Sequence, residues 1–287
     1  MAEDEFNQQQ FPKNGGRLRG LASSIGLEAL NQLAELVAAI GFLTIIPTLS
    51  PRRLFGSQSI KLTAPGLGMG SGYFPLVGLL LALLLSLLVV VLRTLVPSLG
   101  LSALLVVVLV ILTGGLHLDG LMDSCDGVFG GETSERRLEI MQDSRVGSFG
   151  VLGGISALLL KFAFLASLPG LLLIPALLIA LSTSRWTMTL ALNFFPSARS
   201  SGLGVTFRQV ITRSRLVLAG ITALIIALVF GHLVGLAVWI VATGVAFGVG
   251  AWIARRLGGL TGDTYGAIEE VAEVTALLLM VILQRWV

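Results

Sequence analysis

Long apolar stretches, separated by polar connections, dominate the chain. These stretches are residues 73–92, 99–116, 149–168, 171–192, 216–230, 233–254 and 271–283. A helix needs roughly 20 mostly apolar residues to cross the hydrocarbon core of a bilayer, and somewhat shorter segments are tolerated. Most of these stretches lack the polar stripe at helical spacing that a soluble helical bundle requires. The pattern therefore predicts an all-α polytopic membrane protein.

Composition supports the same fold class. Hydrophobic residues make up 55% of the 287 residues and charged residues only 12%, whereas about 25% charged residues is usual in soluble domains. The single cysteine, Cys125, excludes an intramolecular disulfide. The net charge of +3 implies little beyond attraction to anionic lipid headgroups. We expect the lipid bilayer, and no nucleic acid, as a partner.

The N-terminal part leaves the number of spans open. Residues 36–49 form a shorter apolar run that Gly41 interrupts, and runs of about 10–14 residues are more often interfacial or re-entrant than spanning. A full span here would place Lys13, Arg17 and Arg19 outside, against the positive-inside rule. We therefore expect seven full spans plus this half-segment, with eight spans as the close alternative. Residues 1–32 are interpreted as a solvated tail and 33–287 as a single membrane domain.

Basic residues concentrate in the longer connections. These connections are residues 50–72, 117–148, 193–215 and 255–270, whereas the shorter ones contain only Arg93. Cytoplasmic loops of membrane proteins carry an excess of Lys and Arg. We therefore expect all four longer connections to face the cytoplasm.

Carboxylates gather where the apolar pattern breaks after residue 112. Asp119, Asp123 and Asp126 are spaced i, i+4 and i+7, which places them on one face of a helix. Three carboxylates on one face repel one another, so the arrangement has no evident structural purpose. Hard cations such as Mg²⁺ prefer oxygen ligands of this kind beside a substrate phosphate. The alternative is a solvated acidic loop or a helix start that collects negative charge.

A second acidic patch stands at the start of the last apolar stretch. It contains Asp263, Glu269, Glu270 and Glu273, and the expected loop orientation places it on the same side as the first. Glu269 and Glu270 are equally well explained as acids that suit the dipole of a helix start. Glu273 lies inside an apolar stretch, where an unpaired charge is costly and indicates a function. From both patches we predict these Mg²⁺ ligands: Asp119, Asp123, Asp126, Asp263, Glu270 and Glu273.

Groups suited to an anionic substrate are also present. Residues 143–150 combine Arg145 with glycines and serines, whose backbone N–H groups can approach a phosphate. Arg185 lies several residues from the expected end of its stretch, so it either reaches the site or snorkels. Lys161 is deeper and could pair with an acid. His117 is as well explained by a structural role as by a ligand. We assign to substrate binding the following residues: His117, Gly120, Gly127, Ser144, Arg185, Arg199 and Thr261.

Five motifs occur in order along nearly the whole chain. They are FLTIIP at 42–47, YFPLVG at 73–78, GGLHLDGLMDSCDGVFGG at 114–131, IMQDSRVGSFG at 140–150 and GLTGDTYGAIEEVAE at 259–273. In this order they resemble the motifs of the adenosylcobinamide-GDP ribazoletransferase (cobalamin synthase) family. Ser124-Cys125 stands where Thr-Ala is usual, and Gln142 where a basic residue is common. Neither departure removes a carboxylate.

The resemblance implies an enzyme of the bacterial cytoplasmic (inner) membrane with its active site facing the cytoplasm. It implies a Mg²⁺-dependent joining of adenosylcobinamide-GDP to α-ribazole, or its 5′-phosphate, with release of GMP. A ribose hydroxyl would attack the phosphorus attached to cobinamide. Asp126, Asp143 and Arg145 are the candidate catalytic residues, of which Asp126 or Asp143 would accept the hydroxyl proton. A homo-oligomer is left open.

Two other functions fit parts of the pattern. A CDP-alcohol phosphotransferase acting on lipid would carry Asp-x-x-Asp-Gly-x-x-Ala-Arg, whereas here the spacing from Asp119 to Asp123 is one residue longer and Ala-Arg is missing. A cation transporter would carry carboxylates near the bilayer midplane, whereas these patches stand at the ends of apolar stretches. Both alternatives are therefore less well supported.

Overall fold

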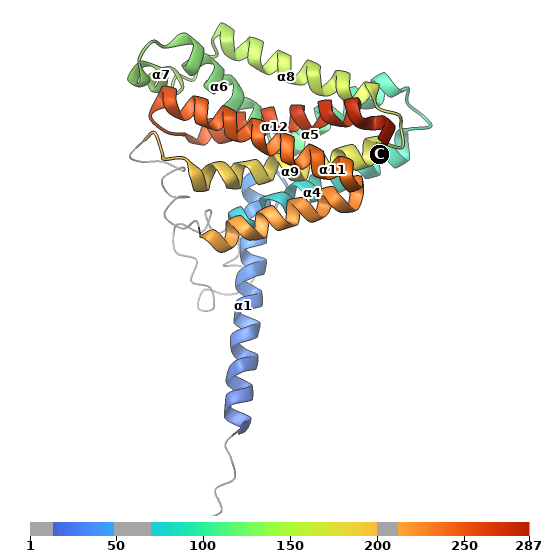
Figure 1. The fold of residues 1–287 in the computed structure, drawn as a ribbon, viewed down its shortest axis with the longest axis vertical. Coiled ribbons are helices and arrows are strands. Elements are labelled where there is room, and N and C mark those ends of the chain that lie inside the picture. Colours follow the sequence, from blue (N-terminus) through green and yellow to red (C-terminus); the bar gives the residue numbers. More distant parts are fainter. Residues whose placement is uncertain (1–13, 49–69, 200–211, 287) are drawn as a thin grey trace, which may run out of the picture.

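The protein is a helical bundle from which one helix projects (Figure 1). The computed structural model describes residues 14–48, 70–199 and 212–286, with side chains from residue 28 onward. The main helices are α1 (Asn14–Leu43), α4 (Phe74–Leu92), α5 (Ser98–Thr113), α6 (Leu116–Gly130), α7 (Ser134–Ile140), α8 (Ser148–Ser167), α9 (Leu173–Phe194), α11 (Arg213–Leu257) and α12 (Gly262–Leu283). Short 3-10 helices, Gly70–Tyr73 and Gln284–Trp286, precede α4 and follow α12. The all-α fold class is confirmed.

The apolar stretches become helices with nearly the predicted bounds. The stretch 73–92 corresponds to α4 with its preceding 3-10 turn, 149–168 to α8 and 171–192 to α9. The two stretches between 216 and 254 form α11, which breaks at His232 (φ 49°, ψ −130°) and folds back on itself (Figure 1). The last helix begins at Gly262 rather than near residue 271, so the second acidic patch lies within α12.

Among the described residues, four helical segments are long and apolar enough to cross a membrane: Gly70–Leu92, α8, α9 and α11. A fifth arises only if α5 and α6, which meet at 89°, count as one broken span. Helix α5 is short, with 16 residues, and α12 contains three glutamates. The polytopic membrane fold is supported, whereas a count of seven or eight spans is not confirmed. Helix α6 falls almost wholly within the connection of residues 117–148, outside the apolar stretches.

Helix α9 forms the centre of the bundle. Its residues from Ala176 to Leu192 are buried, and it packs against α4, α11 and α12. Gly78 of α4 lies against the backbone of Leu181, where a Cβ atom would clash, and such close approach is common between membrane helices. The outer faces carry exposed apolar side chains such as Leu87 and Leu152. These faces are suited to lipid, since extensive apolar exposure is unfavourable in water.

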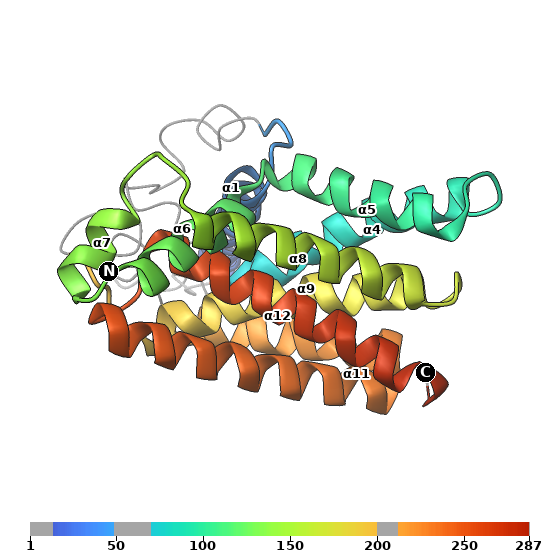
Figure 2. The same ribbon diagram turned by 90° about the horizontal axis from the view of Figure 1, so that it is seen from above.

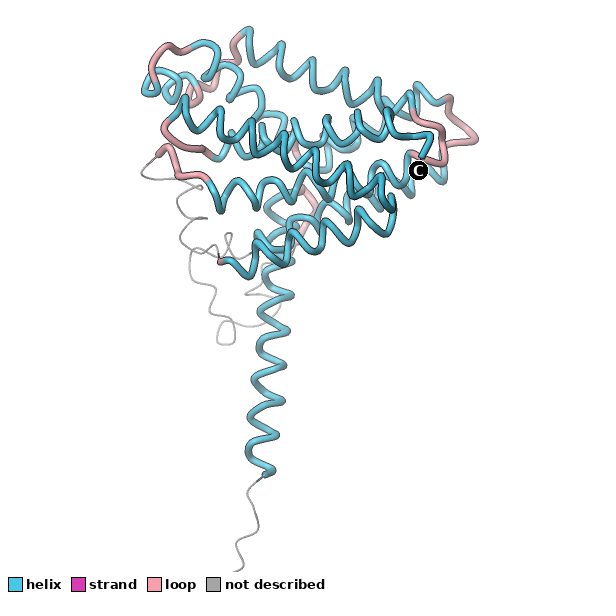
Figure 3. The backbone as a smooth tube through the Cα atoms, viewed as in Figure 1, coloured by secondary structure: helices cyan, strands magenta, loops and turns pink. Residues whose placement is uncertain are grey.

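The two ends of the bundle differ. The short connections at residues 93–97, 168–172 and 232 lie at one end, and the described parts of the long connections lie at the other (Figures 2 and 3). We call this second end, formed by residues 131–147, 195–199 and 258–261, the loop end. The described parts of the long connections therefore share one side, as the charge pattern predicts. Their cytoplasmic orientation stays a prediction.

Helix α1 begins inside the segment interpreted as a solvated tail and runs without a break to Leu43. Its first turns stand clear of the bundle (Figure 1). Its last turns contact it, because Leu43 is buried and Glu35 pairs with Arg215 at 2.8 Å. After α1 the backbone N–H of Ile45 donates to Leu112. The proposed boundary at residue 32 thus falls within a helix, and residue 49 of the half-segment lies outside the described residues.

Candidate functional site

Glycines bring three helices together around α6. Gly114 and Gly115 adopt left-handed conformations (φ 62° and 71°), which let the chain turn from α5 into α6. Farther along, a Cβ atom at Gly120 would lie 2.5 Å from the carbonyl oxygen of Asp263, and one at Gly127 would lie 2.8 Å from the carbonyl oxygen of Arg137. The predicted substrate-binding glycines therefore act first as points of close helix contact. Gly120 places α6 directly against the first turn of α12, and Gly127 places it against α7.

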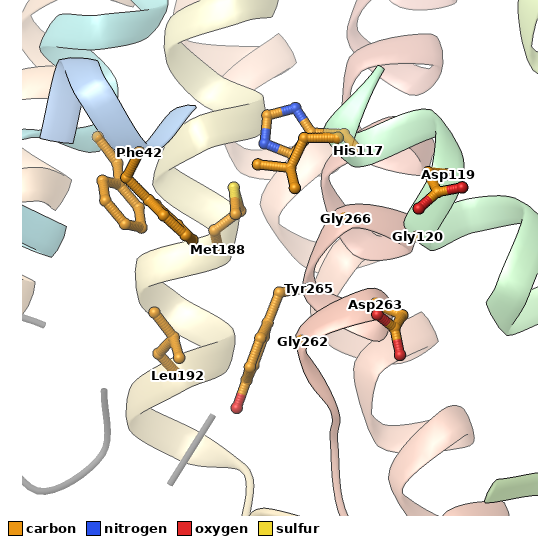
Figure 4. Close-up of a pocket in the computed structure, with 12 residues that line it drawn as sticks. Phe42, His117, Asp119, Gly120, Met188, Leu192, Gly262, Asp263, Tyr265 and Gly266 are labelled. Atoms are coloured by element: carbon orange, nitrogen blue, oxygen red, sulfur yellow. The ribbon is translucent and has the colours of Figure 1, made fainter. Parts of the chain in front are cut away.

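This contact brings carboxylates from two helices together at the loop end. Asp119 and Asp263 lie on the same side of a cavity in Figure 4. Burial, together with the charges of Asp119, Asp263 and Asp126, raises the pKa of Asp123 to about 6. Within the described residues the opposing cation is Arg199, whose guanidinium lies 3.8 Å from the Asp263 carboxylate. We call Asp119, Asp123 and Asp263 the acidic group.

Arg199 reaches this place because two loops pair. The backbone N–H of Ala198 donates to Leu260, and that of Leu260 donates to Pro196. Gly259 permits the contact, since a Cβ atom there would lie 2.6 Å from the Ala198 nitrogen. Thr261, predicted to bind substrate, accepts a hydrogen bond from the backbone N–H of Thr264 and caps α12. The capping role accounts for Thr261 without a substrate.

Asp126 is bound to the start of α8. Its two carboxylate oxygens accept hydrogen bonds from the backbone N–H groups of Gly147 at 2.7 Å and Gly150 at 2.8 Å. A carboxylate at a helix N-terminus satisfies otherwise unpaired N–H groups and complements the helix dipole. The geometry therefore favours a positioning role for Asp126 over the predicted metal-ligand and proton-acceptor roles.

Asp143, Ser144 and Arg145 form an exposed turn between α7 and α8. Arg145 donates to the Asp143 carboxylate from its side chain at 2.7 Å and 3.0 Å and from its backbone at 3.0 Å. These hydrogen bonds lower the pKa of Asp143 to about 2, which makes it a poor proton acceptor near neutral pH. The turn borders a cavity of about 330 Å³ that Asp126 also lines.

Glu270 and Glu273 do not join the acidic group. Lys161 Nζ lies 2.8 Å from Glu270 and 2.7 Å from Glu273, and Arg185 lies 2.6 Å from Glu273 and from Glu269. All of these side chains are buried. With His117, which lies 3.4 Å from Glu269, they form what we call the buried charge cluster.

The cluster argues against three sequence-based assignments. Glu270 and Glu273 already face cations at ion-pair distance, so they are poorly placed to bind Mg²⁺. Arg185 is 1% exposed and is engaged by two carboxylates, so it is poorly placed to bind substrate. The sequence did contain a signal for these buried ion pairs. Lys161 is a second cation, besides Arg185, within an apolar stretch, and such a cation requires a buried partner.

A cavity of about 110 Å³ adjoins the acidic group (Figure 4). Asp119, Gly120 and Asp263 lie on one side of it, and apolar side chains of α1, α4, α9 and α12 complete it. His117 contributes to its wall and is 2% exposed. Its Nε2 atom has no hydrogen-bond partner among the described residues. Of the predicted substrate-binding residues, His117 and Gly120 therefore border a cavity next to the carboxylates.

The acidic group has the donor chemistry of a magnesium site. Within the described part of the chain, no three His, Cys, Asp or Glu side chains are close enough to hold a metal by themselves. However, Mg²⁺ is usually bound through one or two carboxylates together with water and substrate phosphates. Burial and the repulsion between these carboxylates raise the pKa of Asp123, and a bound cation would relieve the repulsion. Asp119, Asp123 and Asp263 thus fit a magnesium site that the substrate completes.

Comparison with known proteins places the chain in a family. The family model described as cobalamin-5-phosphate synthase matches residues 35–281. The chain is 40% identical to an adenosylcobinamide-GDP ribazoletransferase of Desulfitobacterium hafniense, with 86% of this chain and 96% of the relative covered. It is 37% identical to the protein of that name from Escherichia coli K12, with 84% and 96% covered. No solved structure matches the chain. The chain therefore belongs to the cobalamin-5-phosphate synthase family.

Proposed function

We propose that the acidic group is the Mg²⁺ site of an adenosylcobinamide-GDP ribazoletransferase. Family membership and the names of the relatives support the reaction, which joins adenosylcobinamide-GDP to α-ribazole or its 5′-phosphate and releases GMP. One structural observation carries the assignment of the site. Carboxylates from α6 and α12 converge beside a cavity, with Arg199 as the facing cation among the described residues.

The roles of the residues follow from their positions. One or two of the carboxylates of Asp119, Asp123 and Asp263 would hold Mg²⁺ together with water and substrate phosphates, and the ion would neutralise charge on the diphosphate. Gly120 keeps the two helices close enough for their carboxylates to share one ion. Arg199, next to Asp263, is placed to donate hydrogen bonds to a phosphate oxygen.

The loop between α7 and α8 contributes a second anchor for an anion. Asp126 ties the start of α8 to α6 through the N–H groups of Gly147 and Gly150, so it fixes where the preceding turn lies. Arg145 in that turn is exposed and borders the adjoining cavity. Its guanidinium is therefore free to leave Asp143 for a phosphate, at small cost because exposed ion pairs contribute little.

The loop end is proposed to face the cytoplasm of the bacterial inner membrane. The support is the excess of basic residues in the long connections. Labelling of Ser134→Cys, in a protein in which Cys125 is replaced, should require a reagent that crosses the membrane. If an impermeant reagent applied to intact spheroplasts labels this cysteine, the loop end faces the opposite side of the membrane and the proposed orientation is wrong.

Turnover by the purified protein tests the function. In nanodiscs supplied with adenosylcobinamide-GDP, α-ribazole and Mg²⁺, GMP should form, and chelation of the metal should stop its release. Asp119→Asn, Asp123→Asn and Asp263→Asn should each lower the rate at least 100-fold while the protein elutes as the folded species. Glu135→Gln is the matched control, since Glu135 is an exposed loop-end acid in the first turn of α7. Normal turnover in all three Asp variants would remove the assignment.

A further inference from the structure

Three aromatic side chains lie together on the surface near the loop end. The ring centroid of Phe129 in α6 is 5.8 Å from that of Phe149 in α8 and 5.8 Å from that of Trp252 in α11. Phe129 is 53% exposed, Phe149 43% and Trp252 38%, so their mutual contact buries only part of each ring. We call these three residues the aromatic cluster. Because such an exposed apolar patch is unfavourable in water, it is suited to a further partner.

Three arginines adjoin the aromatic cluster. The Cζ atom of Arg256 lies 4.6 Å from the centroid of the Trp252 ring, which is a cation–π contact. Arg137 of α7, which packs beside α11 at the loop end (Figure 2), donates a hydrogen bond from Nη1 to the carbonyl oxygen of Arg256 at 3.1 Å. Arg255 is the chain neighbour of Arg256 and is likewise exposed. Within the described part of the chain, no carboxylate lies at ion-pair distance from these three side chains. Their charges are therefore available to an anion.

The exposed side chains around the aromatic cluster follow a fixed order along the helices. On α11, exposed Val245 precedes Trp252, and the two exposed arginines of the last turn follow. On α8, Phe149 stands in the first turn, and exposed Leu152 comes next in the direction away from the loop end. Toward the loop end the surface thus changes from aliphatic to aromatic to basic. Membrane proteins show this order where the acyl chains give way to the lipid headgroups.

The charge of this surface favours an anionic phospholipid over other partners. A soluble phosphate compound would pair with the arginines but would leave the aromatic and aliphatic side chains uncovered. A second copy of the chain that used the same surface would bring its own arginines against these, and like charges repel. An anionic phospholipid satisfies both parts of the surface, with its phosphate at the guanidinium groups and its acyl chains along α8 and α11.

We propose that the aromatic cluster, together with Arg137, Arg255 and Arg256, binds the headgroup of an anionic phospholipid. The boundary of the bilayer at the loop end then passes through Trp252, and α7 lies among the headgroups. Phe129 belongs to the helix that carries two members of the acidic group, so the bound lipid contacts the same helix as that group. The lipid site does not depend on the reaction, because none of its side chains belongs to the acidic group.

Quenching of Trp252 fluorescence tests the proposal. The full chain in detergent micelles is titrated with phosphatidylglycerol or with phosphatidylcholine, each carrying bromine on its acyl chains, and Trp252→Phe identifies the part of the emission that comes from Trp252. In the parent protein, phosphatidylglycerol should quench this part at a concentration at least tenfold lower than phosphatidylcholine. Arg255→Gln and Arg256→Gln should each raise the phosphatidylglycerol midpoint about fivefold, which is the contribution of one basic residue near an anionic surface. The phosphatidylcholine midpoint should stay within twofold, which shows that the surface is intact.

Arg93→Gln is the matched control, because it removes an exposed arginine at the other end of the bundle and should change neither midpoint. Equal midpoints for the two lipids in the parent protein would overturn the site, and so would an unchanged phosphatidylglycerol midpoint in both arginine variants. If inorganic pyrophosphate releases the quenching, the arginines bind a soluble phosphate compound and the lipid site is wrong. If neither lipid quenches Trp252, protein covers the aromatic cluster and the lipid site is equally wrong.

Discussion

Replacing Arg185 by methionine distinguishes a substrate-binding role from a structural one. Arg185 is 1% exposed and lies 2.6 Å from both Glu269 and Glu273. If it bound substrate, Arg185→Met would fold normally and raise the KM for adenosylcobinamide-GDP. Because two buried carboxylates lose their cation, we expect instead that Arg185→Met lowers the free energy of unfolding.

The charges of the buried cluster determine how much stability each substitution costs, and they predict a larger loss for removal of a cation than for removal of a carboxylate. Three carboxylates, Glu269, Glu270 and Glu273, face two permanent cations, Lys161 and Arg185. Removing one partner from a buried ion pair costs about 3–5 kcal/mol, so Arg185→Met should lower the folded-to-unfolded ratio at least 100-fold. Loss of one carboxylate leaves two carboxylates for two cations. Glu269→Gln should therefore cost only about 1–2 kcal/mol.

The double variant tests whether the two groups act on each other. In Arg185→Met/Glu269→Gln, Lys161 faces the remaining carboxylates and fewer like charges are buried together. Its loss of stability should be smaller than the sum of the two single losses by about 1–3 kcal/mol, as for residues in direct contact. Stability is measured as the midpoint of unfolding in a denaturant titration of protein in detergent micelles.

A matched control uses the same substitution at an exposed pair. Arg136 lies 2.8 Å from Glu139 at the loop end, and both side chains are about two thirds exposed. Exposed ion pairs contribute about 0–1 kcal/mol, so Arg136→Met should leave the unfolding midpoint nearly unchanged. A structural role for Arg185 is contradicted if Arg185→Met unfolds at the same midpoint as the parent protein. It is also contradicted if the stability losses of Arg185→Met and Glu269→Gln simply add in the double variant.

Three further predictions concern the loop end. Gly120→Ala should lower GMP release at least tenfold without loss of the folded species, because the new Cβ would lie 2.5 Å from the Asp263 carbonyl oxygen. Gly244→Ala in α11, where a new Cβ would meet nothing within 4 Å, should be neutral in the same assay. Asp126→Asn should cost about 1.5–3 kcal/mol in the denaturant titration, because an amide accepts only one of the two backbone N–H groups. Asp143, with a pKa near 2, is ionised throughout the neutral range, so Asp143→Asn should leave the shape of the pH–rate profile between pH 5 and 8 unchanged; a lost limb would identify it as the proton acceptor.

The helices could be predicted from the sequence because their cause is local. A segment inside lipid must satisfy its backbone hydrogen bonds internally, so every long apolar stretch is expected to be helical. The break in α11 at His232 also has a local signal, the short interruption between two apolar stretches. The start of α12 was missed because the acidic residues after Gly262 interrupt the apolar pattern without interrupting the helix.

The sequence could not predict which acids of α6 join the acidic group and which one caps another helix, because this depends on neighbours that are distant in the sequence. Asp119 and Asp126 share a helix face at a spacing of i, i+7, but a rise of about 1.5 Å per residue separates them by about 10 Å along the axis. Over that length the neighbour of α6 changes from the start of α12 to the start of α8. One face therefore carries an acid next to a cavity at one end and a helix cap at the other.

Helix α12 connects the buried charge cluster with the acidic group. Asp263 lies in its first turn, and Glu269, Glu270 and Glu273 lie in the next turns. Their pairing with Lys161 and Arg185 opposes rotation or sliding of α12 against α8 and α9, since either movement would separate buried charges. The ion pairs of these glutamates with Lys161 and Arg185 thereby hold Asp263 opposite α6. Activity lost in Arg185→Met should consequently track loss of folded protein, whereas Asp119→Asn should remain less active than the parent protein when activity is expressed per folded molecule.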